Sequence, residues 1–231
     1  MSSPIILALD TKELSEAEKW IELSLPQIDH FKIGLEFFLK HGLDGVASLK
    51  SRFGFNLFLD LKLYDIPNTV KGAVESIASL QPKFLTVHAS GGGKMIAQAA
   101  AALPKGSITA VTVLTSFSED DFSSFGYRND IPSTVKLWAA QAIKSGASSI
   151  VCSPFEASLI RSISDEVTII TPGVRVVGDD VGDQARVMTP KDAIENGANF
   201  IVIGRSITSE SAKGTKAMQD KIHQIIESLQ S

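Results

Sequence analysis

A carboxylate and an ammonium group lie two residues apart in the segment DLKLYDIPNT, which spans residues 60 to 69. They belong to Asp60 and Lys62, and Asp65 follows three residues later, just before Pro67. In an extended strand, residues i and i+2 point to the same face, with Cα atoms about 6.6 Å apart. Asp60 and Lys62 should therefore share one site, as either a simple ion pair or an acid and a base that act together.

Taken alone, an Asp-x-Lys pattern is more often an ordinary ion pair at the end of a strand. Asp10 alone could be a helix cap or a turn residue, and Lys32 alone could bury its stem and extend its ammonium group to solvent. However, charged residues occur in four predicted strands, with Arg205 in the last of them. A buried charge is costly unless it is paired or used, so this shared placement favours a functional site.

A phosphate site is predicted where the last two apolar runs end. The segments TPGV (171–174) and IGRS (203–206) both carry glycine, and Arg205 adds a guanidinium group. Backbone N–H groups, a helix N-terminus and an arginine are the groups that bind phosphate at such positions. The simpler interpretation of Gly204 is a tight turn, but two such segments on neighbouring strands favour phosphate binding.

Other residue types do not suggest a metal or nucleophile site. The four histidines have no metal-ligand spacing, and we expect His88 to be a hydrogen-bonded structural residue. Cys152 is the only cysteine and lies in the apolar run SSIVCSP, which indicates a small buried side chain.

Eight short apolar runs predict the strands that would position these residues. Their continuous hydrophobicity is typical of parallel strands that are buried on both faces. The runs cover residues 5–10, 30–36, 56–62, 84–89, 107–114, 148–154, 167–174 and 200–207.

The segments between these runs show helical periodicity. Val70, Ala73, Val74 and Ile77 lie on one helix face, as do Ile222, Ile225, Ile226 and Leu229 near the C-terminus. Ser15 and Glu18 match a capping box, which predicts the start of the first helix. Eight strand–helix units in 231 residues predict one (β/α)8-barrel domain over residues 1–231, with an open doubly wound sheet as the alternative.

Two connections are longer than the others, at residues 115–130 and 175–189. Both follow the carboxyl ends of predicted strands, where barrel active sites form, so we expect a lid or a ligand clamp there. Gly178 and Gly182 would let the second connection open and close.

Composition limits the class of partner. With 22 basic and 26 acidic residues the formal net charge is −4, which argues against general nucleic-acid binding. The first apolar run is too short for a membrane span or a signal peptide. We therefore expect a soluble, cytoplasmic protein.

The whole chain resembles orotidine 5'-monophosphate decarboxylases of the bacterial type. DLKLYDIPNT looks like the signature of that family. Six further segments match its members in the same order: LALD (7–10), FKIGLE (31–36), VTVLTS (111–116), TPGVR (171–175), GDQARVMTP (182–190) and VIGRSIT (202–208).

The resemblance implies an enzyme that removes CO2 from C6 of a pyrimidine nucleotide to make UMP, without a cofactor or a metal. It implies a catalytic tetrad of Lys32, Asp60, Lys62 and Asp65, in which Asp65 is supplied by the other subunit of a homodimer. It also implies the following substrate contacts: Asp10 and the partner-supplied Thr69 for ribose, Thr115 or its neighbour Ser116 for the pyrimidine, and Arg175, Gln184, Gly204 and Arg205 for phosphate.

The same resemblance implies how the tetrad works. Lys62 would protonate C6 and stabilise negative charge there, and Asp60 would lie beside the departing carboxylate. Many bacterial members carry His where Tyr64 stands, and we expect Tyr64 to point to the opposite face from Lys62 without loss of activity.

Two alternatives stay open. A sugar-phosphate decarboxylase or synthase of the same barrel type would also carry an Asp-x-Lys-x-x-Asp segment but would use Mg²⁺, and DIPNT and VTVLTS argue against it. A non-catalytic nucleotide-binding barrel would not need the whole tetrad.

Overall fold

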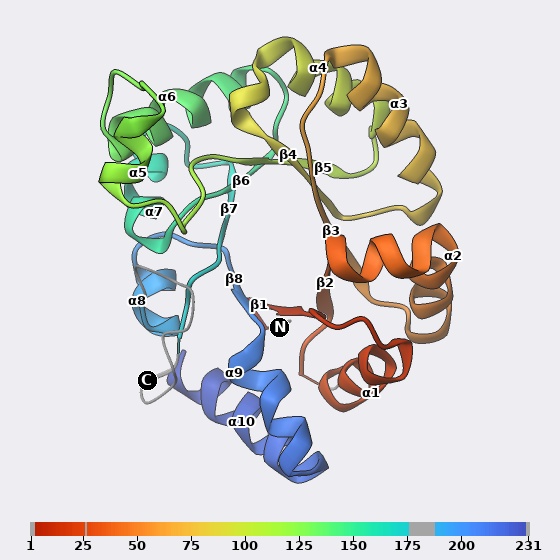
Figure 1. The fold of residues 1–231 in the computed structure, drawn as a ribbon. Helices are drawn as coiled ribbons and strands as arrows, with labels where there is room; N and C mark the ends of the chain where they lie inside the picture. Colours follow the sequence, from red (N-terminus) through yellow and green to blue (C-terminus); the bar gives the residue numbers. More distant parts are fainter. Residues whose placement is uncertain (1–2, 26, 176–187, 230–231) are drawn as a thin grey trace.

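The strands of the computed structural model form a closed barrel around a central axis (Figure 1). The structure describes residues 3–25, 27–175 and 188–229. The strands are β1 Ile5–Ala8, β2 His30–Gly34, β3 Asn56–Leu63, β4 Phe84–His88, β5 Ser107–Val111, β6 Ser149–Val151, β7 Thr168–Thr171 and β8 Phe200–Ile203. Each strand pairs in parallel with its neighbour in the chain.

Pairing between the first and last strands closes the barrel. β1 pairs in parallel with β8, and Ile6 lies opposite Val202. The eight predicted strands and the (β/α)8 barrel are therefore confirmed, and the open sheet is excluded. All carboxyl ends of the strands meet at one rim, as a parallel barrel requires.

Helices surround the barrel on its outer side (Figure 1). The α-helices are α1 Leu14–Ser24, α2 Leu35–Phe53, α3 Pro67–Ile77, α4 Gly93–Ala102, α5 Glu119–Ser124, α6 Ile131–Lys144, α7 Ala157–Arg161, α8 Pro190–Glu195, α9 Arg205–Thr208 and α10 Thr215–Ser228. Short 3-10 turns lie at η1 Ala78–Leu80, η2 Ala89–Gly91, η3 Pro154–Glu156 and η4 Ser209–Lys213. Among the described residues, no helix combines the length and the apolar character needed to cross a bilayer.

Two apolar clusters fill the fold. The larger one packs strands against helices and includes the predicted buried positions Val70, Val74 and Ile77 of α3. The smaller one is built from side chains of the strands alone: Ile6, Phe58, Phe84 and Ile170, with Val151, Phe200 and Val202 against it. Because side chains alternate along a strand, this second cluster is the packed interior of the barrel. Cys152 is buried, as predicted.

Two local predictions differ from the structure. The capping box at Ser15 and Glu18 is wrong, because α1 already begins at Leu14 after Glu13 as the N-cap. The apolar run 200–207 is not one strand, since β8 ends at Ile203 and α9 begins at Arg205. The connection 115–130 contains the helix α5, and most of the connection 175–189, including Gly178 and Gly182, lies outside the described residues.

Candidate active site

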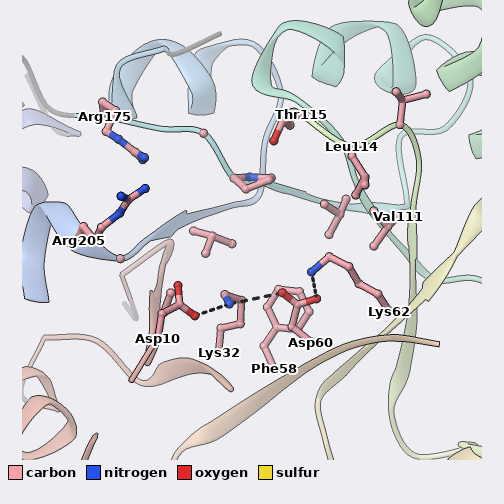
Figure 2. Close-up of a pocket in the computed structure, with 17 residues that line it drawn as sticks. Asp10, Lys32, Phe58, Asp60, Lys62, Val111, Leu114, Thr115, Arg175 and Arg205 are labelled. Carbon is pink, nitrogen blue, oxygen red and sulfur yellow. Dashed lines mark hydrogen bonds and ion pairs between the residues drawn. The ribbon is translucent and has the colours of Figure 1, made fainter. Parts of the chain in front are cut away.

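A cavity of about 280 Å³ opens at the carboxyl ends of the strands. Its floor includes Phe58, Val151 and Val202, which also belong to the interior cluster of the barrel. The polar side chains around it are Asp10, Lys32, Asp60, Lys62, Thr115, Arg175 and Arg205 (Figure 2). The cavity therefore gathers charged groups directly above an apolar core.

Four charged side chains form a chain of alternating sign along one wall (Figure 2). The Nζ of Lys32 lies 3.0 Å from Oδ1 of Asp10 and 3.4 Å from Oδ2 of Asp60. The Nζ of Lys62 lies 2.8 Å from Oδ1 of Asp60. Asp60 thus stands between two ammonium groups, and Lys32 stands between two carboxylates. The residues follow β1 or belong to β2 and β3, so adjacent strands bring them together.

The ion pairs decide the charge states of Asp60 and Lys32. Burial alone would raise the pKa of Asp60, but the charges of Lys32 and Lys62 and the hydrogen bonds from Lys62 and Thr86 hold it below its ordinary value. Burial would likewise lower the pKa of Lys32, but the charges of Asp60 and Asp10 outweigh it and raise this pKa. Asp60 is therefore ionised and Lys32 protonated at neutral pH.

The end of β3 is irregular where it presents Lys62. The backbone of Lys62 has φ of 49°, in the left-handed region, and the register between β3 and β4 shifts between Leu59 and Leu63. Both Asp60 and Lys62 line the cavity, as predicted from their spacing, but Lys62 is not in an extended conformation.

Two guanidinium groups occupy the other end of the cavity. Figure 2 shows Arg175 and Arg205 pointing toward one another on the side away from Lys62. Arg205 is the first residue of α9, so the prediction that it belongs to strand eight is wrong. A Cβ on Gly204 would lie 3.3 Å from Cβ of Ala8, so glycine keeps the backbone close to β1 here. Two cations that converge in one cavity suit an anion such as phosphate.

The remaining predicted residues do not all line the cavity. Thr115 lines the cavity and its neighbour Ser116 is not among the lining residues. Asp65 and Thr69 are exposed and do not line the cavity of their own chain; Oδ1 of Asp65 accepts a hydrogen bond from the N–H of Ile66. Gln184 lies outside the described residues.

His88 and Tyr64 belong to a neighbouring aromatic cavity. Their ring centroids lie 5.6 Å apart. Among the described residues, the side chain of His88 makes this ring contact and no hydrogen bond. The prediction that His88 is hydrogen-bonded is therefore wrong. Burial, and then the charge of Lys62, keep the pKa of His88 below its ordinary value. Within the described ranges, no three His, Cys, Asp or Glu side chains are grouped to bind a metal ion.

The sequence patterns missed Thr86, which is completely buried in β4. Its hydroxyl group donates a hydrogen bond to Oδ1 of Asp60 at 3.0 Å. The signal was a single hydroxyl-bearing residue in the apolar run FLTVH, which by itself is a common feature of buried strands.

Comparisons with known proteins identify the family of the chain. Residues 3–219 match the model of the family described as "Orotidine 5'-phosphate decarboxylase / HUMPS family". The chain is 44% identical over 218 residues to an orotidine 5'-phosphate decarboxylase of Thermobifida fusca, covering 94% of each chain. It is also 44% identical over 219 residues to one from Wolbachia pipientis, covering 93% of this chain and 96% of that one.

A solved structure is similar over its whole length. The crystal structure of orotidine 5'-phosphate decarboxylase from Lactobacillus acidophilus superposes with a TM-score of 0.85 at 32% identity, covering 100% of both chains.

Proposed function

Because the chain belongs to the orotidine 5'-phosphate decarboxylase / HUMPS family and is a carboxy-lyase, we propose that Lys62 and Asp60 remove CO2 from orotidine 5'-monophosphate to give UMP, without a cofactor. The observation that supports these roles is the division of one cavity into two ends. One end carries the Asp10–Lys32–Asp60–Lys62 chain of charges, and the other carries Arg175 and Arg205.

This division suits the charges of a nucleotide. The 5'-phosphate would bind Arg175 and Arg205, which lie where barrels commonly hold phosphate. The pyrimidine ring would then lie over Phe58 near Thr115, with C6 directed to Lys62. Asp10 would accept a hydrogen bond from ribose, and Gln184 is proposed as a further phosphate contact.

The chemistry follows from the charges at the Lys62 end. Breaking the bond between C6 and the carboxylate leaves an electron pair on C6 that the ring π-system cannot delocalise. The Nζ of Lys62 would donate a proton to that pair, so that UMP forms while CO2 leaves. Lys62 would afterwards regain a proton from solvent.

Asp60 has a second effect on the same step. It is ionised and buried, so a substrate carboxylate next to it would experience like-charge repulsion that ends when neutral CO2 forms. The ammonium group of Lys62 favours the transition state for the opposite reason, because negative charge develops on C6. Lys32 would keep Asp60 in place from the other side.

The substrate's phosphate would bind far from the bond that breaks. Its binding energy can position the ring against the charged wall, since remote interactions contribute to orienting the reacting group.

Assembly and location are further parts of the proposal. Asp65 and Thr69 are exposed on a single chain, beside the exposed Tyr64 and Ile66. We propose a homodimer in which Asp65 and Thr69 of each subunit complete the cavity of the other. A cytoplasmic location is proposed because substrate and product are charged nucleotides, which do not cross a bilayer unaided.

The direct test is the loss of orotidine 5'-monophosphate, followed by its ultraviolet absorbance, with purified protein in EDTA. Conversion to UMP at the same rate with and without EDTA supports the substrate and the absence of a metal together. A rate that EDTA abolishes and Mg²⁺ restores would refute the metal-free mechanism. No loss of the nucleotide, together with Mg²⁺-dependent turnover of a sugar phosphate, would favour the magnesium-dependent enzyme. Tight UMP binding without turnover would favour a non-catalytic barrel.

A further inference from the structure

Lys62 has a backbone conformation that a residue with a side chain rarely adopts. Its φ of 49° is in the left-handed region, where the Cβ atom approaches the neighbouring carbonyl group. The regular register between β3 and β4 is interrupted at the same place. Something outside β3 must therefore hold the backbone of Lys62, because the regular strand pairing does not.

The hydroxyl group of Thr86 is in the right place to do so. The N–H of Lys62 donates to Oγ1 of Thr86 at 2.8 Å. A backbone N–H can only donate, so the hydroxyl accepts this bond and gives its own single proton to Oδ1 of Asp60 at 3.0 Å. The same Oδ1 accepts a hydrogen bond from Nζ of Lys62 at 2.8 Å.

These contacts close a ring that includes both ends of Lys62. Its backbone binds Thr86, Thr86 binds Asp60, and Asp60 binds the ammonium group of Lys62. Thr86 is completely buried, so water does not compete for either bond. The ring also fixes which way the hydroxyl points, because only one of its partners can accept a proton.

We propose that Thr86 is a positioning residue, whose single hydroxyl group fixes the backbone of Lys62 and the carboxylate of Asp60 relative to one another. This inference rests on the proposed function, in which Lys62 is the proton donor and Asp60 stands beside the departing carboxylate. Thr86 does not line the cavity and acts through the two residues that do.

The proposed role of Thr86 depends on its hydroxyl group and not only on the space that its side chain fills. A valine at position 86 has nearly the shape of threonine, so it retains the packing but removes both hydrogen bonds. The N–H of Lys62 then has no acceptor in β4, and its strained backbone is free to relax toward an extended conformation. Near-attack geometry is sensitive to displacements of about 1 Å, which can change a rate by about 100-fold.

The experiment compares three variants with the wild type. Thr86→Val removes the hydroxyl group, and Thr86→Ser retains it. Thr109→Val is the matched control, because Thr109 is equally buried, lies opposite Thr86 in the adjacent strand and bonds Ser149 at 2.6 Å instead of a charged residue. Thr86→Ala removes the same hydroxyl group with less volume and serves if the valine variant does not fold.

The expected result is a split between turnover and binding. Thr86→Val should lower kcat for orotidine 5'-monophosphate by about 100-fold, while KM and the Kd for UMP change by less than about threefold. Thr86→Ser should recover most of the lost kcat, and Thr109→Val should keep a kcat close to that of the wild type. A valine variant with wild-type kcat, or a serine variant as slow as valine, would overturn the inference.

Two measurements do not depend on activity. Asp60 faces Lys32 and Lys62 and lies near His88. Loss of the hydrogen bond from Thr86 should raise the pKa of Asp60. Carboxyl ¹³C NMR of Thr86→Val and of the control Thr109→Val measures this pKa. A crystal structure of Thr86→Val should show Lys62 outside the left-handed region. If the wild type does not convert the nucleotide, the proposed function is wrong. An unchanged pKa and backbone in Thr86→Val would instead refute the positioning role.

Discussion

Asp60 and Lys62 are joined by a 2.8 Å hydrogen bond between Oδ1 and Nζ, although the backbone of Lys62 has left the extended conformation of the strand that carries both. The spacing of two residues predicted that the side chains would share a face. The structure achieves this through an irregular strand end, which a third residue from β4 holds. The proposed proton donor Lys62 and the ionised Asp60 therefore lie together at the rim of the barrel.

Arg205→Ala should weaken nucleotide binding selectively. Hydrogen bonds to a charged group are worth about 1.5–3 kcal/mol, so the Kd for UMP should rise roughly 10- to 100-fold. Binding of uridine, which has no phosphate, should change little. The measurement is calorimetric titration of both ligands, with the exposed Arg52→Ala at the end of α2 as the control. Equal losses for UMP and uridine would place Arg205 outside the phosphate site.

Lys62→Ala and Asp65→Ala should complement one another if the site is shared between subunits. Each variant alone should be nearly inactive. When equal amounts are unfolded together and refolded, about half of the dimers should be mixed. A mixed dimer has one site with both substitutions and one site with neither, so activity should recover to about a quarter of wild type.

The control for this experiment is the size of the refolded species. Gel filtration must show dimers in the mixture and in each variant refolded alone. Dimers without recovered activity would mean that Lys62 and Asp65 act within one chain. Monomers with full wild-type activity would rule out the shared site altogether.

His30 should make stability depend on pH through contacts at the opposite end of the barrel. It is buried, with Nδ1 2.6 Å from Oδ1 of Asp29 and Nε2 2.8 Å from Nζ of Lys83. Lys83 can only donate, so Nε2 accepts and the ring is neutral. Burial lowers the pKa of His30 from its ordinary 6.5; the hydrogen bond that its Nδ1–H donates to Asp29 opposes this, and the charge of Lys83 reinforces it.

The direction in which stability changes with pH follows from proton binding by His30. Below pH 6.5 the unfolded chain protonates this histidine before the native state does, so the free energy of unfolding falls as pH falls through that value. His30→Gln should reduce this dependence between pH 7.5 and 5.5, by no more than about 1.4 kcal/mol per pH unit. Urea unfolding measures it, and the exposed His223→Gln should keep the wild-type slope. Equal slopes for both variants would contradict the role of His30.

The sequence predicted the barrel because a continuous apolar run is typical of a strand that is buried on both faces of a parallel sheet. Few folds other than a barrel contain eight such strands. It also predicted which charges meet, because carboxyl ends of parallel strands share one rim. Asp10 follows β1, Lys32 belongs to β2 and Asp60 belongs to β3, and the three still converge.

Features that depend on contacts between distant residues were not predictable. The bond from Thr86 to Asp60 spans 26 positions, and nothing near Thr86 in the chain indicates its partner. The left-handed φ of Lys62 has no local signal, since glycine, the usual residue for this conformation, is absent there. Ser15 and Glu18 match a capping box, but the helix had already begun at Leu14, so the match had no structural effect.

The most direct test of the central claim is the turnover of Lys62→Ala compared with its binding of UMP. If the ammonium group supplies the proton to C6, kcat should fall by at least about 1,000-fold, while circular dichroism stays that of the wild type and UMP still binds. Lys105→Ala, which removes an exposed lysine that precedes β5 at the opposite end of the barrel, should leave kcat unchanged. A folded Lys62→Ala protein that keeps a substantial fraction of wild-type kcat would show that Lys62 is not the proton donor.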